Sequence, residues 1–250
     1  WMPWLRRLTP LLNPLLKVRW GRGLVERLFG ITCQRRLPPI ASRSFLQQMP
    51  RAWSAPPARL NARTVILFVD HYANWHEPEL AFLAGKILEH QGLTVHVPYA
   101  QRRSGFDLLV AGDLEAARPL AERNLACLEE FARAGCPIVC LEPSAAVCLR
   151  EEYPALLNHP DAAVVAAQVD ELGHYLGRLH AAGELRTDFA PVETSAAYHQ
   201  PCHLRSQGKS SSLLDLCNLI PGLSTPRIEA GCSGMAGVFG WDAATVDQSL

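Results

Sequence analysis

Apolar residues recur at three- and four-residue intervals in the first thirty residues, with Arg and Lys between them. This spacing predicts a helix, and Pro10 and Pro14 interrupt it, which favours two short helices over one long one. The apolar positions are Leu5, Leu8, Leu11, Leu12, Leu15, Leu16, Leu24, Val25, Leu28 and Phe29. Such a face can lie on a membrane surface as an amphipathic anchor, or it can pack on the rest of the chain or on a neighbouring protein.

The pattern then changes to short apolar runs separated by helical segments. Residues 37–60 are rich in Pro, Ser and Ala and read as a connector. We expect strands at 64–70, 93–97 and 137–141, and helices at 78–90, 113–135 and 162–182. A second unit begins with a strand at 194–198, followed by a helix at 211–220 and a glycine-rich motif at 231–240. Alternating strands and helices predict an α/β fold with a parallel sheet, and the second unit reads as incomplete.

The net charge of zero hides a strong asymmetry along the 250 residues. Residues 1–63 hold half of the 24 lysines and arginines and one acid, Glu26. We therefore expect a basic arm that docks on something negative: the acidic body, a partner subunit or a membrane surface. No signal peptide opens the sequence and no apolar run approaches the ~20 residues that span a bilayer. The expected location is cytoplasmic, and we expect the chain to be a fragment of a longer protein.

Two cysteines fall in the most specific motifs of the chain. Tyr198-His-Gln-Pro-Cys-His-Leu204 is followed, 30 residues after Cys202, by Gly231-Cys-Ser-Gly-Met-Ala-Gly237. Each motif follows an expected strand, at the sheet edge where open α/β folds place ligands. A thiolate can bind a soft metal or a cluster, and neighbouring glycines leave backbone amides free to approach the sulfur. Buried free cysteines are also common, so these two residues alone leave both readings open.

The surrounding residues resemble the second cysteine-rich (CCG) repeat of a known family. Pro201-Cys-His203, Leu219-Ile-Pro-Gly-Leu223 and Cys232-Ser-Gly-Met-Ala-Gly237 carry that resemblance. The family includes the iron–sulfur subunits of anaerobic glycerol-3-phosphate dehydrogenase, glycolate oxidase and heterodisulfide reductase, and fused FAD-linked D-lactate-type dehydrogenases. First-repeat motifs are matched by residues 70–79, 101–105 and 142–153. The resemblance implies two tandem parallel-sheet repeats, the second truncated, behind a helical basic arm, with domains at 1–60, 61–190 and 191–250.

The sequence departs from the family pattern at several cysteine positions. Where the first repeat of the family has cysteines, this chain has His71, Arg103, Ser104 and Ala145, so we expect no cluster there and a structural role for His71. In the second repeat Cys202 is present, and the usual Cys-Cys pair is Cys232-Ser233. The resemblance implies Cys202 and Cys232 as metal ligands, and His199, His203 and Gly234 as cofactor-binding residues. Two thiolates are fewer than the four that a cluster normally takes.

The remaining cysteines read as ordinary core or arm residues. Cys127, Cys136, Cys140, Cys148 and Cys217 fall in strand or helix patterns. Cys33 lies near Arg35 and Arg36, which would lower its pKa if the thiol is exposed. The sequence has no Cys-x-x-Cys zinc pair, no P-loop and no Gly-x-Ser-x-Gly elbow.

Three functions compete. The first is an iron–sulfur electron-transfer module, of 4Fe-4S type, for a flavin-linked hydroxy-acid or glycerol-3-phosphate dehydrogenase that passes electrons toward a quinone-type acceptor. FAD would then lie on another domain or a flavoprotein partner, and the protein could sit peripherally at the inner face of the membrane. The second is a cluster-free scaffold that docks such a dehydrogenase. Nucleic-acid binding ranks last, because the arm has too few aromatic residues for a stacking platform; we expect no nucleic-acid partner.

Overall fold

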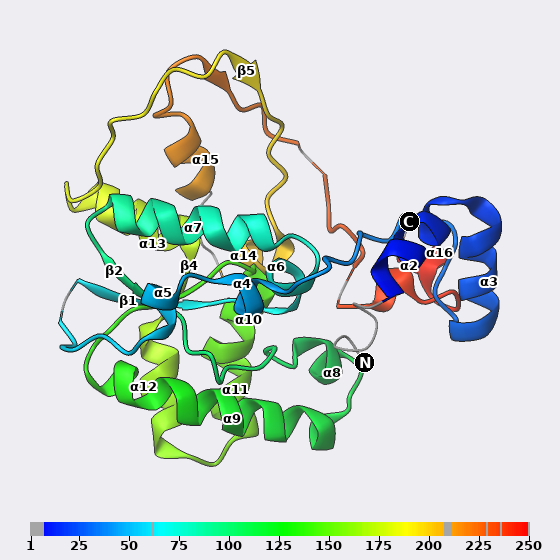
Figure 1. Cartoon of the computed structure of the whole chain (residues 1–250), viewed down its shortest axis with the longest axis horizontal. Coiled ribbons are helices and arrows are strands. Elements are labelled where there is room, and N and C mark those ends of the chain that lie inside the picture. The colour runs from blue at the N-terminus through cyan, green and yellow to red at the C-terminus, as the bar shows by residue number, and fades with distance from the viewer. Residues whose placement is uncertain (1–7, 62, 208–211, 229, 236, 250) are drawn as a thin grey trace.

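The structure, a computed structural model, describes residues 8–61, 63–207, 212–228, 230–235 and 237–249. Its centre is a fully parallel four-stranded sheet in the order β2-β1-β3-β4, which confirms the predicted α/β class (Figure 1). The strands are β1 (Thr64–Phe68), β2 (Thr94–His96), β3 (Ile138–Cys140) and β4 (Val169–Glu171). The partner pairs Ile66↔Ile138 and Ile138↔Val169 fix their register.

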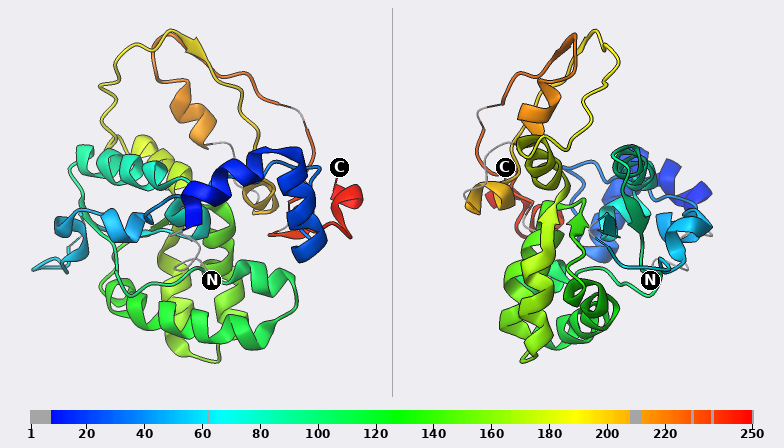
Figure 2. Two further views of the ribbon diagram at one scale, coloured as in Figure 1. Left: turned by 45° about the vertical axis from the view of Figure 1, so that its right-hand side comes forward. Right: turned by 90° about the vertical axis from the view of Figure 1, so that its left-hand side faces the viewer.

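Helices cover both faces of this sheet, as expected for buried parallel strands. Alternate residues of β1 point to opposite sides. Ile66 and Phe68 pack with the helices at Leu114–Arg133 (α9) and Pro160–Gln168 (α12), and Val65 and Leu67 pack with those at Pro78–His90 (α7) and Leu172–Ala181 (α13). Figure 2 shows the same two layers after a turn of the view. The helices of this unit are α6 (His71–Trp75), α7 (Pro78–His90), α8 (Phe106–Val110), α9 (Leu114–Arg133), α10 (Pro143–Val147), α11 (Tyr153–Leu156), α12 (Pro160–Gln168) and α13 (Leu172–Ala181), with a π-helical turn at Cys148–Glu152.

Local signals set several of these helix ends. Pro78 opens α7 in the first turn, where its missing N–H costs nothing, and Gly92 adopts a left-handed conformation just after the helix. The Asp113 carboxylate caps α9 by accepting a hydrogen bond from the backbone N–H of Ala116. These boundaries agree with the sequence-based expectation.

The expected helix at 162–182 is wrong, because two helices with a strand between them occupy this segment. Val169–Glu171 pairs with β3 as the last strand of the sheet, and all three residues are buried. The Glu171 side chain then caps α13 by accepting from the backbone N–H of His174. Pairing with β3 therefore overrides a continuous run of good helix formers.

The segment expected as a connector also contributes to the core. Two short helices, α4 (Phe45–Gln48) and α5 (Arg51–Ser54), bring Phe45 and Trp53 into the cluster on the α7 side of the sheet. Trp53 packs so closely on Gly85 of α7 that a side chain at that glycine would collide with the indole ring. The domain boundaries at 60/61 and 190/191 remain predictions.

The basic arm forms two helices, α2 (Thr9–Lys17) and α3 (Arg19–Phe29), but the break differs from the expected one. Pro14 lies inside α2, and the chain leaves the helical conformation at Val18. Pro10 stands in the first turn of α2, where proline is tolerated. Leu5 lies outside the described residues. Among the residues that the structure describes, no helix is long and apolar enough to cross a bilayer.

The second unit is small: its strands and the helix at Ser212–Cys217 lie beyond α7 and α13, whereas the helix at Val246–Ser249 lies beside α2 and α3 (Figures 1 and 2). Its two strands, β5 (Thr194–Ser195) and β6 (Leu223–Ser224), are parallel, and an isolated bridge joins Tyr198 to Arg227 further along the same direction. The helices are α14 (Cys202–Ser206), α15 (Ser212–Cys217) and α16 (Val246–Ser249), with a 3-10 turn at Phe239–Trp241. Leu216 of α15 is buried in the core cluster on the α13 side.

Candidate functional site

The two thiols that the sequence singles out lie close together. Cys202 begins α14, four residues after Tyr198, and Cys232 follows Arg227 by five residues. Because Tyr198 and Arg227 pair in parallel, the two segments that follow them leave the small sheet at the same end. The side chains of Cys202 and Cys232 lie close enough for each thiol to shift the pKa of the other. The fold therefore brings together two sulfur atoms from distant parts of the sequence.

The two thiols differ in their surroundings. Cys202 is half-buried; burial raises its pKa, and the hydrogen bond to Cys232 and the charge of Cys232 add to that rise. Cys232 is exposed, and its pKa is lowered, first by the backbone N–H of Gly234, which donates to its Sγ at 3.3 Å, and then by the hydrogen bond from Cys202. A sulfur that accepts hydrogen bonds is stabilised as a thiolate, which is the form that binds metals.

Gly234 is required by its backbone and by its neighbour. Its φ is +70°, a conformation that side chains rarely adopt, and a Cβ there would collide with the carbonyl oxygen of Ser249. The absence of a side chain lets the amide of Gly234 reach the sulfur of Cys232. This is the place of the predicted cofactor-binding glycine; its binding role stays a prediction.

The two predicted histidines connect the thiol pair to its surroundings. A ring nitrogen of His199 lies 2.9 Å from the carbonyl oxygen of Gly231, so the two motifs are tied together. Nδ1 of His203 lies 3.9 Å from the Sγ of Cys202, and the ring meets Phe106 of α8 edge-on at 4.9 Å between centroids. His203 thus links the thiols to the first unit.

The arm holds the loop that carries Cys232. Arg35 donates to the carbonyl oxygen of Ser249 at 2.7 Å and to its hydroxyl at 3.1 Å. Ile31 forms an antiparallel bridge with Asp242, and Gln34 bonds Asp247 at 3.1 Å. Figure 1 shows α2, α3 and α16 gathered in one lobe. The arm therefore docks on the chain's own C-terminal segment, one of the three surfaces expected for it.

The condition under which Arg35 and Arg36 would lower the pKa of Cys33 is not met. The thiol is half-buried, and its pKa is raised. The largest cause is a hydrogen bond to the carboxylate of Glu26, the single acid of the arm. That acid lies seven residues away on α3, and only the fold brings it to Cys33.

Polar residues that the sequence analysis did not select gather at the C-terminal edge of the first sheet. Asp70 follows β1 and accepts from the backbone N–H of Ser104 at 2.8 Å and from its hydroxyl at 2.5 Å. Glu142 follows β3, and its pKa is raised to about 8 by burial and then by the charge of Asp70. Each acid ends an apolar strand run, which is a signal that the sequence contains.

His71 and Arg103 border the same edge. His71 is half-buried, its ring lies 5.5 Å from that of His76, and burial lowers its pKa to about 4. Arg103 forms an ion pair with Asp107. Three of the four positions at which the family has first-repeat cysteines, His71, Arg103 and Ser104, thus line one crevice. Ala145 is fully buried nearby in α10.

Comparison with known proteins gives relatives among dehydrogenases and reductases. A subunit of the anaerobic glycerol-3-phosphate dehydrogenase of Escherichia coli K12 is 26% identical over 237 residues, covering 93% of this chain and 58% of the relative. A subunit of the fumarate reductase (CoM/CoB) of Methanothermobacter marburgensis is 26% identical over 68% of this chain and 32% of its own length. The D-2-hydroxyglutarate dehydrogenase of Pantoea ananatis is 22% identical over 99% of this chain and 24% of its own length.

These relatives confirm the resemblance that the cysteine and glycine motifs predicted. The chain spans 58% of the length of the glycerol-3-phosphate dehydrogenase relative and a third or less of the other two. No model of a protein family and no solved structure matches the chain.

Proposed function

We propose that this chain is the iron–sulfur electron-transfer module of a flavin-linked hydroxy-acid or glycerol-3-phosphate dehydrogenase. The observation that supports this most directly is the proximity of the thiols of Cys202 and Cys232, beside the amide of Gly234. Sulfur ligands next to backbone N–H donors are the usual surroundings of an iron–sulfur centre. The relatives, with glycerol-3-phosphate and D-2-hydroxyglutarate dehydrogenases among them, fit the same assignment.

The donor set fits part of such a centre. A cluster of the 4Fe-4S type takes four cysteine ligands as a rule, and this site offers two thiols that lie close together. In the proposal Cys202 and Cys232 supply two ligands, and Gly234 donates its N–H to the sulfur of Cys232. A bound cluster would supply one-electron transfer. His199 and His203 would orient the two motifs around it.

The flavin and the substrate chemistry belong, in this proposal, to another domain or subunit. The chain spans little more than half of the glycerol-3-phosphate dehydrogenase relative that it matches and a smaller share of D-2-hydroxyglutarate dehydrogenase. We propose a flavoprotein dehydrogenase that carries FAD as the partner, and a quinone-type molecule as the acceptor of the electrons. The proposed location is cytoplasmic, at the inner face of the membrane.

A docking role without a cluster is the second candidate, and the arm favours it. Several large apolar side chains of α2 and α3 are exposed, among them Leu11, Trp20 and Phe29, each about 70% exposed or more. Basic residues such as Arg19 and Arg27 lie between them. Such a surface suits a protein partner or an anionic membrane. Both candidates place the chain in a dehydrogenase assembly, and only the first needs iron.

Anaerobic reconstitution with iron and sulfide separates the two candidates. We expect the chain to acquire visible absorption and bound iron, and Cys202→Ser and Cys232→Ser to lose most of that iron. Cys217→Ser is the matched control, because Cys217 is another half-buried thiol of the second unit. Iron content equal to that of the parent chain in all three variants, or no iron in the parent, would remove the cluster and leave the docking role.

A further inference from the structure

A long crevice runs along the C-terminal edge of the first sheet and contains no residue of the thiol pair. It consists of two adjoining hollows of about 730 Å³ each, which share Asp70, His71, Arg103 and Asp107. Strand β1 lies between β2 and β3. The chain adds β2 on one side of β1 and then adds β3 and β4 on the other side, so the strand order reverses at β1. Open α/β sheets bind ligands at such a switch point, and this volume suits a small molecule.

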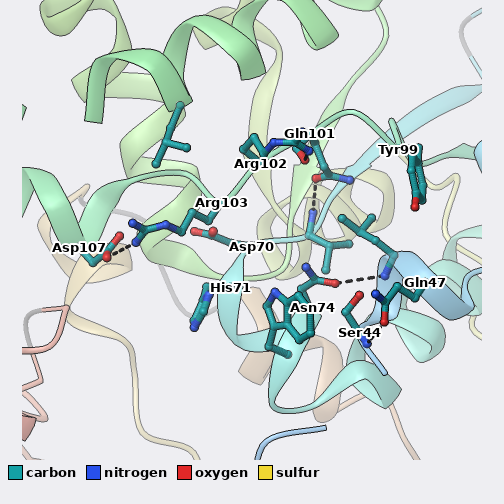
Figure 3. Close-up of a pocket in the computed structure, with 14 residues that line it drawn as sticks. Ser44, Gln47, Asp70, His71, Asn74, Tyr99, Gln101, Arg102, Arg103 and Asp107 are labelled. Carbon is teal, nitrogen blue, oxygen red and sulfur yellow. Dashed lines mark hydrogen bonds and ion pairs between the residues drawn. The ribbon is translucent and has the colours of Figure 1, made fainter. Parts of the chain in front are cut away.

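One wall of the crevice presents a buried donor without a partner. Gln101 is 1% exposed, and its Oε1 accepts from the backbone N–H of Val69 at 3.0 Å. That bond fixes the amide orientation, since Val69 can only donate. The Nε2 of Gln101 is buried and has no hydrogen-bond partner within the described residues. In Figure 3 it lies on the side of Tyr99. A buried N–H donor without a hydrogen-bond acceptor destabilises the fold, unless a bound ligand supplies the acceptor.

A second amide in the same hollow is oriented in the same way. The Oδ1 of Asn74 accepts from the backbone N–H of Leu46 at 3.1 Å (Figure 3). Among the described residues, the Nδ2 of Asn74 has no hydrogen-bond partner. Gln101 and Asn74 therefore both turn their oxygen toward a backbone N–H. Their nitrogens are available for an acceptor atom in the hollow.

The charges around these amides favour an anion. Arg102 and Arg103 line the hollow, and Arg102 bonds only backbone carbonyls of its own loop among the described residues. Of the two acids in this hollow, Asp107 is paired with Arg103 and Asp70 is held by Ser104.

We propose that this crevice binds a small organic anion, a carboxylate or a phosphate ester. Its oxygen atoms accept from Gln101 Nε2 and Asn74 Nδ2, its charge faces Arg102, and its carbon skeleton lies between Trp75 and Tyr99. The residues that would hold the anion lie in the first unit and are other than the proposed iron ligands, whereas the second hollow is also lined by Met235 and Gly237 of the second unit. Anion binding at these residues does not require a bound cluster.

Isothermal titration of the iron-free chain tests the site. The probes are glycerol 3-phosphate, D-2-hydroxyglutarate, inorganic phosphate and uncharged glycerol. We expect saturable binding of at least one organic anion, and at least about tenfold weaker binding in Gln101→Glu. This variant keeps an oxygen for the Val69 N–H and replaces the free donor by an acceptor. Whichever organic probe binds shows whether carboxylate or phosphate is preferred.

Gln168→Glu is the control for the added charge, because Gln168 ends α12 at the opposite edge of the sheet. It should bind as the parent chain does. Asn74→Asp repeats the test with the other amide and should also weaken binding, which keeps the proposal testable if Gln101→Glu does not fold. Parent-like affinity in a folded Gln101→Glu or Asn74→Asp, no binding of either organic anion at millimolar concentration, or equal binding of inorganic phosphate would overturn it.

Discussion

Cys202 and Cys232 lie close enough to shift each other's pKa although thirty positions separate them in the sequence. The contact depends on two short parallel strands that deliver both motifs to one end of the small sheet. Three other cysteines, Cys136, Cys140 and Cys148, are buried in or beside the core of the first unit. Cys202 and Cys232, by contrast, form a pair of thiols of which one is half-buried and the other exposed.

Mild oxidation of the iron-free chain should reveal this pairing. Treatment with diamide is expected to join Cys202 and Cys232 in a disulfide, because the two thiols lie close together and Cys232 is exposed. Mass spectrometry of the digested protein would identify the linked peptides. A mixture of disulfides in which this pair is not the main product would contradict the described geometry.

The acid at the end of β3 should make stability depend on pH. Burial and the charge of Asp70 raise the pKa of Glu142 from 4.5 to about 8. The native state therefore holds a proton that the unfolded chain releases, so this contribution is complete below pH 4.5 and is lost as pH rises toward 8. Glu142→Gln, which can still accept from the N–H of Ala73, should be less sensitive to pH.

Urea unfolding of both proteins at pH 5, 6.5 and 8 measures this difference. We expect the variant to gain relative to the parent as pH rises, by up to a few kcal/mol, since one pKa unit corresponds to about 1.4 kcal/mol. Parallel curves for parent and variant would show that Glu142 titrates normally.

Two glycines should respond in opposite ways to the same substitution. Gly85→Ala should destabilise the fold by about 1–3 kcal/mol, because the new methyl group collides with the buried ring of Trp53. Gly23→Ala in α3 meets open space and should stabilise by about 0.5–1 kcal/mol through helix propensity. Thermal unfolding of both variants checks the pair, and a neutral Gly85→Ala would contradict the close packing of α5 on α7.

Arg35 should control the order of the C-terminal segment. Arg35→Ala removes the hydrogen bonds to Ser249, so we expect faster amide hydrogen exchange over residues 231–249 with little change in the sheet. Arg36→Ala is the matched control, because Arg36 is the exposed neighbour in the same segment. Equal exchange in both variants would mean that the arm does not hold this segment.

Local signals in the sequence predicted much of the first unit. The apolar run before Asp70, the proline at the start of α7 and the Asp113 cap all act within a few residues, so their effects can be read without the fold. The convergence of Cys202 and Cys232 was also anticipated, because parallel strands end at a common edge.

Long-range contacts explain what the sequence analysis missed. The strand β4 forms because β3 offers a free edge, although residues 162–182 have helical periodicity. Trp53 enters the core because Gly85 leaves room for it, although its neighbours are typical of a connector. The orientation of the Gln101 amide depends on its bond with Val69, 32 positions earlier, so a local sequence pattern cannot predict it.

The lobe in which the arm meets the C-terminal segment also bears on the order of folding. Its bonds from Arg35 to Ser233 and Ser249 join residues 198 and 214 positions apart, whereas β1 and β2 pair across about thirty. Closing so long a loop is entropically costly until the intervening chain is compact, so we expect the sheet to form before the lobe. During synthesis, Cys232 emerges only after the whole first unit. Loading of any metal at this sulfur would therefore be a late step in maturation, after the N-terminal helices have met the C-terminal segment.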